Sequence, residues 1–119
     1  MEAPPHTHLI YSKLVTPQEL LEAFHAALAL GNEKRNWRYF ADLTDMEGGH
    51  SVLDLYGLID LFEAKNMPRT MREAILMPTL SSTHEEVRFY ETTCVNRGFF
   101  IRVFTRREDA LAWLTGSGG

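Results

Sequence analysis

The chain has 119 residues, of which 45% are hydrophobic and 24% are charged, and its formal net charge is −4. This length is typical of one globular domain, and the acidic balance argues against a nucleic-acid partner because proteins of that class are usually basic. Cys94 is the only cysteine, so an internal disulfide and a cysteine-based metal site are excluded. A single thiol fits a reducing compartment, and we expect a cytoplasmic protein.

The two ends of the chain differ in composition from the rest. Residues 1–7 contain two prolines and predict a loose arm, and residues 116–119 predict a flexible tail because they contain only glycine and serine. No basic region followed by an apolar run stands at the start, so we expect no signal peptide. The longest uncharged apolar run, residues 26–30, is too short for an integral membrane segment. The prediction is one domain over residues 8–115.

The first strand and the first helix are marked by clear signals. Residues 9–15 are rich in β-branched and aromatic side chains and predict a strand. Thr16 follows at the N-cap position, Pro17 stands at the first helical position, and Glu19 supplies the acid of a capping box. Apolar residues then recur at helical spacing up to Gly31, which we expect to end the helix.

The second unit repeats this order. Residues 37–43 predict a strand, and the polar, glycine-bearing segment 44–50 predicts a loop. Ser51 follows as an N-cap with Asp54 at the acid position of a capping box. Apolar residues at helical spacing then predict a helix that ends at residues 66–68.

The third unit is the shortest. Residues 74–77 predict a strand that a proline stops, and a helix follows. Its capping box is formed either by Ser82 with Glu85 or by Thr83 with Glu86.

The fourth unit has an apolar strand, residues 99–104, with large apolar side chains on both of its faces. Thr105 and Glu108 predict a capping box for a helix that runs to Leu114. Because both strand faces are apolar, each face of the sheet needs a cover.

Four strand–helix units in succession predict an α/β domain with a mostly parallel four-stranded sheet and right-handed crossovers. Sequential crossovers place the helices largely on one face, so the other face needs a helix, the N-terminal arm, a second subunit or an apolar ligand. The loops that follow parallel strands lie at one edge of the sheet, where ligands usually bind. The candidate ligand-edge residues are Asp42, Thr44, Asp45, His50, Ser51, Thr79, Ser82 and His84.

Histidine, serine and aspartate at this edge raise the question of catalysis. Neither Ser51 nor Ser82 stands in the Gly-x-Ser-x-Gly turn of a nucleophile. The five histidines lack the spacing of a metal site, and the loop before Ser51 matches neither a P-loop nor a dinucleotide motif. We therefore expect no catalytic residue, no metal and no cofactor.

Arginines are concentrated in the second half of the chain, between Arg69 and Arg107. They allow a basic patch for an acidic partner. The simpler interpretation is an exposed face on which they pair with nearby acids, each pair contributing about 0–1 kcal/mol.

The last strand and helix carry the most specific resemblance. Phe100-Ile-Arg-Val-Phe104, followed by Glu108-Asp-Ala-Leu-Ala-Trp-Leu114, is similar to the ending common among small bacterial proteins of the SpoIIAA-like group, the STAS and STAS/SEC14 domains. The strand end at residues 41–45 and the strand at residues 72–77 are also similar in residue type to those of that group. The resemblance implies a four-turn β-α superhelix. It also implies an extra first strand, which residues 1–7 are too short and too rich in proline to form.

The resemblance also implies a regulatory position. In STAS domains that antagonise anti-sigma factors, a kinase phosphorylates a serine at the start of the second helix. Ser51 falls at that position and is the candidate phosphosite, although His50 replaces the preceding acid of the family motif. The simpler interpretation of Ser51 is a plain N-cap.

These observations predict a non-enzymatic STAS-like regulatory or interaction module that acts through protein–protein binding, with a protein partner or a second copy of the chain. The alternative is a small-molecule or lipid carrier of the SEC14-like type that binds an apolar small molecule. A hydrolase that uses His50 or His84 is the least favoured function.

Overall fold

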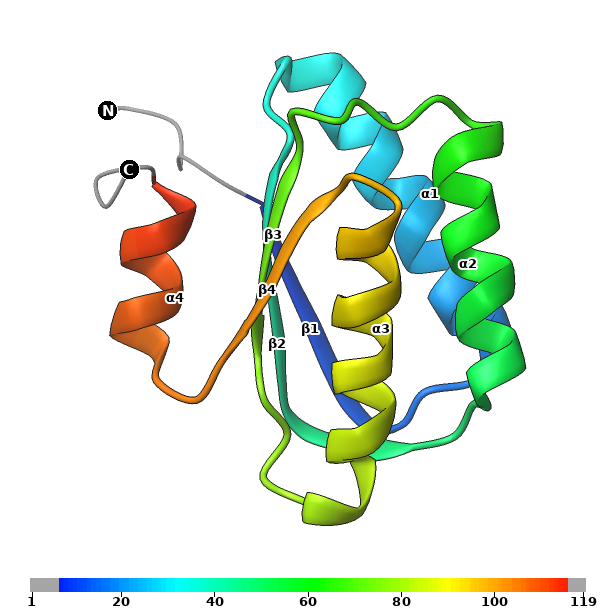
Figure 1. The fold of residues 1–119 in the computed structure, drawn as a ribbon, viewed down its shortest axis with the longest axis vertical. Coiled ribbons are helices and arrows are strands. Elements are labelled where there is room, and N and C mark those ends of the chain that lie inside the picture. The colour runs from blue at the N-terminus through cyan, green and yellow to red at the C-terminus, as the bar shows by residue number, and fades with distance from the viewer. Residues whose placement is uncertain (1–6, 116–119) are drawn as a thin grey trace.

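The computed structural model describes residues 7–115, which form a four-stranded sheet and four α-helices (Figure 1). In chain order the elements are β1 (Thr7–Leu14), α1 (Pro17–Lys34), β2 (Arg38–Gly48), α2 (Val52–Ala64), β3 (Arg72–Leu76), the short 3-10 helix η1 (Ser81–Thr83), α3 (His84–Asn96), β4 (Phe100–Phe104) and α4 (Arg107–Leu114). The strand order is β1-β2-β3-β4, and every neighbouring pair is parallel. The predicted α/β class and parallel sheet are confirmed.

The predicted terminal segments mostly fall outside the described residues, except that Thr7 already belongs to β1. Within residues 7–115, no helix combines the length and the apolarity that crossing a membrane requires.

Helices lie on both faces of the sheet: α1, α2 and α3 cover one face, and α4 lies alone on the other (Figure 1). The main core lies under the three helices, and a smaller core joins Phe40 of β2 to Ala110 and Leu114 of α4. The second face is therefore covered by a helix, one of the four covers that the sequence left open. No strand follows α4 in the described part of the chain, so this helix does not have to connect two neighbouring parallel strands and is free to pack on the opposite face of the sheet.

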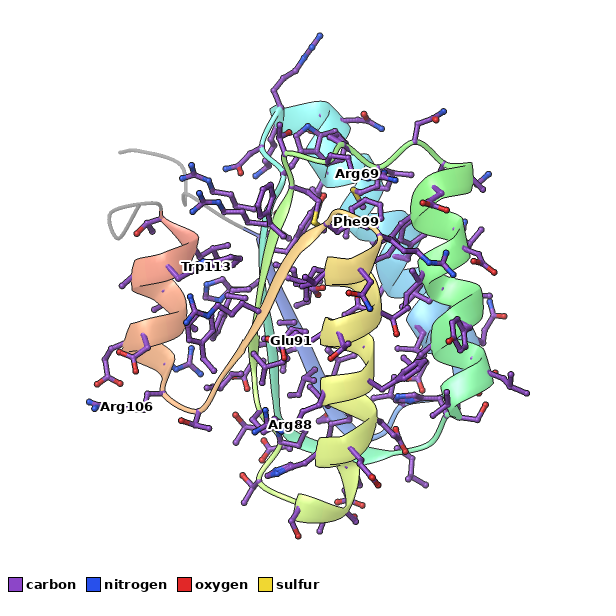
Figure 2. All side chains as sticks on the ribbon, viewed as in Figure 1. Arg69, Arg88, Glu91, Phe99, Arg106 and Trp113 are labelled. Carbon is purple, nitrogen blue, oxygen red and sulfur yellow. The ribbon has the colours of Figure 1, made fainter. Side chains whose placement is uncertain are left out.

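The cover that α4 provides is incomplete. Trp113 extends from α4 toward the sheet (Figure 2), where its ring packs against Phe104. Ile10 on β1 remains 76% exposed, and Phe100 on β4 remains 56% exposed.

β2 is longer than predicted, so the expectation of a loop over residues 44–50 is wrong for most of that segment. Its end continues to pair with β1, with Asp45 opposite Ser12 and with two register shifts along the pair. Met46 is buried in the main core and anchors this extension. The loop itself is reduced to Gly49 and His50. A Cβ on Gly49 would lie 2.7 Å from the Val15 backbone nitrogen, so only glycine allows this approach.

The two predicted capping boxes in the first half of the chain are confirmed. In α1 the Thr16 hydroxyl accepts from the Glu19 N–H while the Glu19 carboxylate accepts from the Thr16 N–H, and Ser51 and Asp54 repeat the arrangement in α2. These boxes set the start of each helix as the local sequence predicts.

The two predicted boxes in the second half are wrong. Thr83 has an α-helical backbone conformation within η1, and its hydroxyl donates to the Leu80 carbonyl. α4 is preceded by Arg106 instead of Thr105, and the Glu108 carboxylate pairs with the Arg106 guanidinium. In both cases a competing local partner takes the side chain that a capping box needs.

Gly31 does not end α1, which continues to Lys34 and is closed by Arg35 in the left-handed conformation. The glycine serves close packing instead of termination. A Cβ at this position would lie 2.4 Å from the Trp37 ring and 2.6 Å from the Tyr39 hydroxyl oxygen.

Two glycine-to-alanine variants separate packing from helix propensity. We expect Gly31→Ala to lower the free energy of unfolding by about 1–3 kcal/mol, because the clash outweighs alanine's better helix propensity. Gly57→Ala in α2 meets nothing within 4 Å and should raise the free energy of unfolding by up to about 1 kcal/mol. Urea unfolding of both variants measures the effects; a stabilised Gly31→Ala protein would contradict the packing role.

Candidate functional site

Glu73 is a carboxylic acid inside the main core. It lies on β3, and the alternation of the strand turns it toward α1, α2 and α3, whereas its neighbour Ala74 faces α4. Only 9% of its surface is exposed. The Tyr90 hydroxyl, on α3, donates a hydrogen bond of 2.9 Å to Glu73 Oε1. A buried carboxyl group is costly for folding, so its presence in a core makes Glu73 a candidate site residue.

Burial controls the protonation of this cluster. It raises the pKa of the Glu73 carboxyl to about 7, against the opposing effect of the Tyr90 hydrogen bond. Burial, together with the charge on Glu73, raises the pKa values of the Tyr11, Tyr39 and Tyr90 hydroxyls. The three tyrosines therefore keep their protons and remain hydrogen-bond donors at neutral pH.

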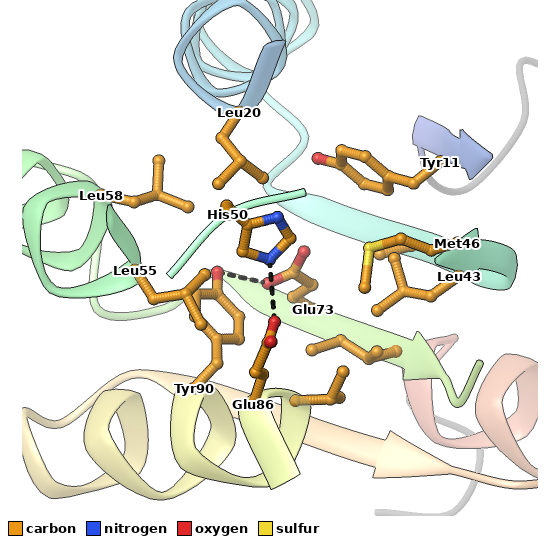
Figure 3. Close-up of a pocket in the computed structure, with 13 residues that line it drawn as sticks. Tyr11, Leu20, Leu43, Met46, His50, Leu55, Leu58, Glu73, Glu86 and Tyr90 are labelled. Carbon is orange, nitrogen blue, oxygen red and sulfur yellow. Dashed lines mark hydrogen bonds and ion pairs between the residues drawn. The ribbon is translucent and has the colours of Figure 1, made fainter. Parts of the chain in front are cut away.

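A cavity of about 60 Å³ lies between the sheet and the three-helix layer, and Glu73 and Tyr90 line it (Figure 3). Its apolar lining consists of Leu20, Ala41, Leu43, Met46, Leu55, Leu58, Ile75 and Val87. A second cavity, of about 40 Å³, shares Tyr11, Glu73 and Tyr90 with the first. Since one water needs roughly 10–15 Å³ of such space, the larger cavity admits several waters or one small molecule.

His50 and Glu86 also line the larger cavity (Figure 3). His50 Nδ1 lies 3.0 Å from the Val15 carbonyl oxygen, and Nε2 lies 3.5 Å from Glu86 Oε2. The Glu86 side chain is 27% exposed, yet its Oε2 atom is buried and has no hydrogen-bond partner. A buried carboxylate oxygen without a donor is rare in folded proteins and marks a place where a further group is expected.

Asp42 and Thr44 of the predicted ligand edge do not lie at the cavity but near α4. Asp42 accepts from the Thr44 backbone and hydroxyl and pairs with Arg107 of α4 at 2.7 Å, on the opposite side of the sheet from His50. Burial pushes the pKa of Asp42 upward, but the hydrogen bonds from Thr44 and Arg107 outweigh it and hold the pKa below its ordinary value. This pair helps to dock α4 and does not reach the cavity.

The remaining predicted edge residues do not reach the cavity either. His84 Nε2 lies 2.7 Å from the Pro78 carbonyl oxygen, and the Thr79 N–H donates to the Thr44 carbonyl. Asp45 and Ser82 are exposed, and Ser51 is the exposed N-cap of α2. Of the predicted set, only His50 lines the cavity.

The histidine, serine and aspartate side chains of this edge do not assemble into a Ser-His-Asp combination. His50 does lie within reach of a carboxylate, that of Glu86, but its hydrogen bonds and ion pairs within residues 7–115 involve no hydroxyl or thiol. Cys94 lies beside Tyr90, and burial raises the pKa of its thiol, so it is not a ready nucleophile. The described part of the chain also has no group of three or more histidines, cysteines or acids placed to hold a metal ion.

Figure 2 places the labelled Arg69, Arg88 and Arg106 on different parts of the molecule. Arg69 pairs with Glu63 at 3.0 Å, and Arg106 pairs with Glu108 at 2.9 Å. These exposed pairs fit the simpler interpretation of the arginines and do not form one basic patch around the cavity.

Sequence reasoning missed Glu73 and treated Tyr90 and Glu86 only as helix residues. A signal was present, because Glu73 directly precedes the apolar segment from Ala74 to Met77 in the same strand. An acid at the beginning of a strand that is covered on both faces has no route to solvent, and this makes it a candidate site residue.

No family model, curated protein or solved structure matches the chain. A function is therefore inferred from the geometry of the cavity and of the surface around it.

Glu73→Gln tests the protonation of the buried carboxyl group. Its pKa of about 7 lies above the ordinary 4.5, so its contribution to stability is fully present below pH 4.5 and is lost as the pH rises through 7. At about pH 4.5 the free energy of unfolding of the Glu73→Gln variant should be similar to that of the native protein. At about pH 8 it should be higher than that of the native protein by about 3 kcal/mol. Urea unfolding across this pH range measures the difference, with Glu85→Gln on the exposed face of α3 as a control that should show none.

Proposed function

We propose that this chain is a non-enzymatic, SpoIIAA-like binding module whose interior cavity holds a small molecule. The observation that carries the proposal is the buried Glu73 carboxyl group at the boundary of two cavities. Ligand sites combine an apolar lining with a few placed polar groups, and this cavity has that composition. A polar group retained in a core at a cost to stability fits a binding role better than a structural one.

Two further features support the SpoIIAA-like part of the proposal. Four strands that follow chain order, each joined to the next through a helix, suit the four-turn β-α superhelix of that group. Ser51 is the N-cap of α2, the place in the chain to which the resemblance assigns the regulatory serine of STAS domains. The small-molecule alternative ranks above the protein-binding one because the interior offers an apolar cavity and one buried, unpartnered carboxylate oxygen, Glu86 Oε2.

Filling the cavity with a larger side chain should weaken binding. A fragment panel with neutral, cationic and anionic members, followed by amide shifts in NMR spectra, should perturb His50, Glu73 and Tyr90 together. Leu58 lines both cavities, and we expect Leu58→Phe to weaken binding by roughly tenfold or more, because the larger side chain occupies the ligand's space.

Leu53→Phe is the matched control, because Leu53 lies on the same helix and is 79% exposed. It should bind fragments like the native protein. If no fragment of any charge perturbs the cavity residues, or if both variants behave alike, the proposed function is wrong.

A protein partner is the second candidate function, favoured by the outer surface of α2. Val52, Leu53 and Tyr56 are all exposed near the start of the helix, next to Ser51. Apolar side chains grouped on one helix suit a partner that covers them, whereas single exposed apolar residues need no explanation. A phosphate on Ser51 would add negative charge at this surface and change its affinity for such a partner.

Leu53→Ser should remove this interaction without unfolding the protein, because the side chain is exposed. The measurement is light scattering of the purified chain for self-association, together with retention of protein from a lysate by the native and variant baits. Ile10→Ser, equally exposed but on β1, is the control. Equal retention by all three baits, with no self-association, would remove this candidate.

A further inference from the structure

The polar groups around the larger cavity share one property: none of them carries a permanent positive charge. They are the carboxyl groups of Glu73 and Glu86, the hydroxyls of Tyr11 and Tyr90, and the His50 ring, and among residues 7–115 no lysine or arginine lines the cavity. Figure 3 shows both carboxyl groups turned toward the space beneath His50. An anionic ligand would meet two acids and no fixed cation there, which disfavours it.

One of the two acids has a buried oxygen that lacks a donor. Tyr90 donates to Glu73 Oε1, so the Glu73 carboxyl group already has one donor. Glu86 Oε2, in contrast, is buried and has no hydrogen-bond partner among the described residues. Buried acceptors without donors are costly, so a molecule that brings N–H donors to this space would be stabilised.

His50 does not supply the missing donor in its neutral form. The Val15 carbonyl can only accept, so the ring proton lies on Nδ1, 3.0 Å from that oxygen. Nε2 is then unprotonated and points a lone pair toward Glu86 Oε2 at 3.5 Å. A ligand group with two N–H donors, placed beside these two atoms, would satisfy both of them.

We infer that the cavity binds a small organic cation, a primary ammonium group held by Glu73 and Glu86 with a short aliphatic chain among Leu55 and Leu58. This inference rests on the proposed function and names its ligand class. An ammonium group has three N–H donors for the carboxylate oxygens, and the rings of Tyr11 and Tyr90 offer faces that attract a cation. The volume of about 60 Å³ limits the ligand to a few heavy atoms.

Three probes of equal length test the charge of the ligand: n-butylammonium, 1-butanol and butyrate, each titrated into the full chain and followed by amide NMR shifts. We expect n-butylammonium to shift the amide signals of His50, Glu73, Glu86 and Tyr90 until they saturate. The affinity for 1-butanol should be lower by roughly tenfold or more, and butyrate should not bind. Stronger binding of the alcohol or of the acid would overturn the inference and leave the proposed function intact. Failure of all three probes, while other fragments still perturb the cavity, would also overturn it.

Variants and proton counting give a second readout. Glu73→Gln and Glu86→Gln should each weaken n-butylammonium binding by roughly tenfold or more, and Glu85→Gln should leave it unchanged. If Glu73→Gln does not fold, Glu86→Gln still decides the outcome. At about pH 6 the native Glu73 carboxyl is largely protonated, so an ammonium ion that pairs with it drives one proton into the buffer. Calorimetry in buffers of different ionisation enthalpy should detect this release, and its absence from native protein that binds the amine would contradict pairing with Glu73.

Discussion

The buried carboxyl group of Glu73 is the physical constraint to which the rest of the core adapts. A parallel sheet covered by helices offers no water to a side chain of its inner strands, and Glu73 lies on such a strand. Two responses reduce the cost: Tyr90 donates a hydrogen bond, and the pKa rises so that the group is neutral over much of the acidic range. The cavities beside it leave room for whatever else satisfies the carboxyl group.

The position of α4 decides which polar residues meet. Because α4 packs on the face opposite the other helices, Asp42 is drawn into a pair with Arg107 there. His50 turns the other way, into the layer beneath α1, α2 and α3. A sheet whose strands follow chain order has no point at which the strand order reverses, and so no crevice opens at the strand ends. The space for a ligand lies under the helices instead.

The candidate site was only partly predictable from the sequence. His50 follows β2 in a short glycine-bearing loop, and its place at the edge of the sheet could be inferred from the strand order. Glu73 and Tyr90 are 17 positions apart, and their hydrogen bond depends on how α3 packs over β3. No local pattern encodes that packing. The unsatisfied Glu86 oxygen is equally invisible in the sequence, because helical spacing presents this residue as an ordinary member of a first turn.

The sequence by itself determined the four strand–helix units, their parallel arrangement, and the starts of α1 and α2 at Thr16 and Ser51. These features depend on interactions over three or four residues and on short crossovers that have one favoured hand. Only the tertiary structure decided the length of β2, the role of Gly31 in packing, and the face that α4 covers. Those features depend on side chains that are distant in the chain and compete for the same buried volume, and a local pattern carries no information about that competition.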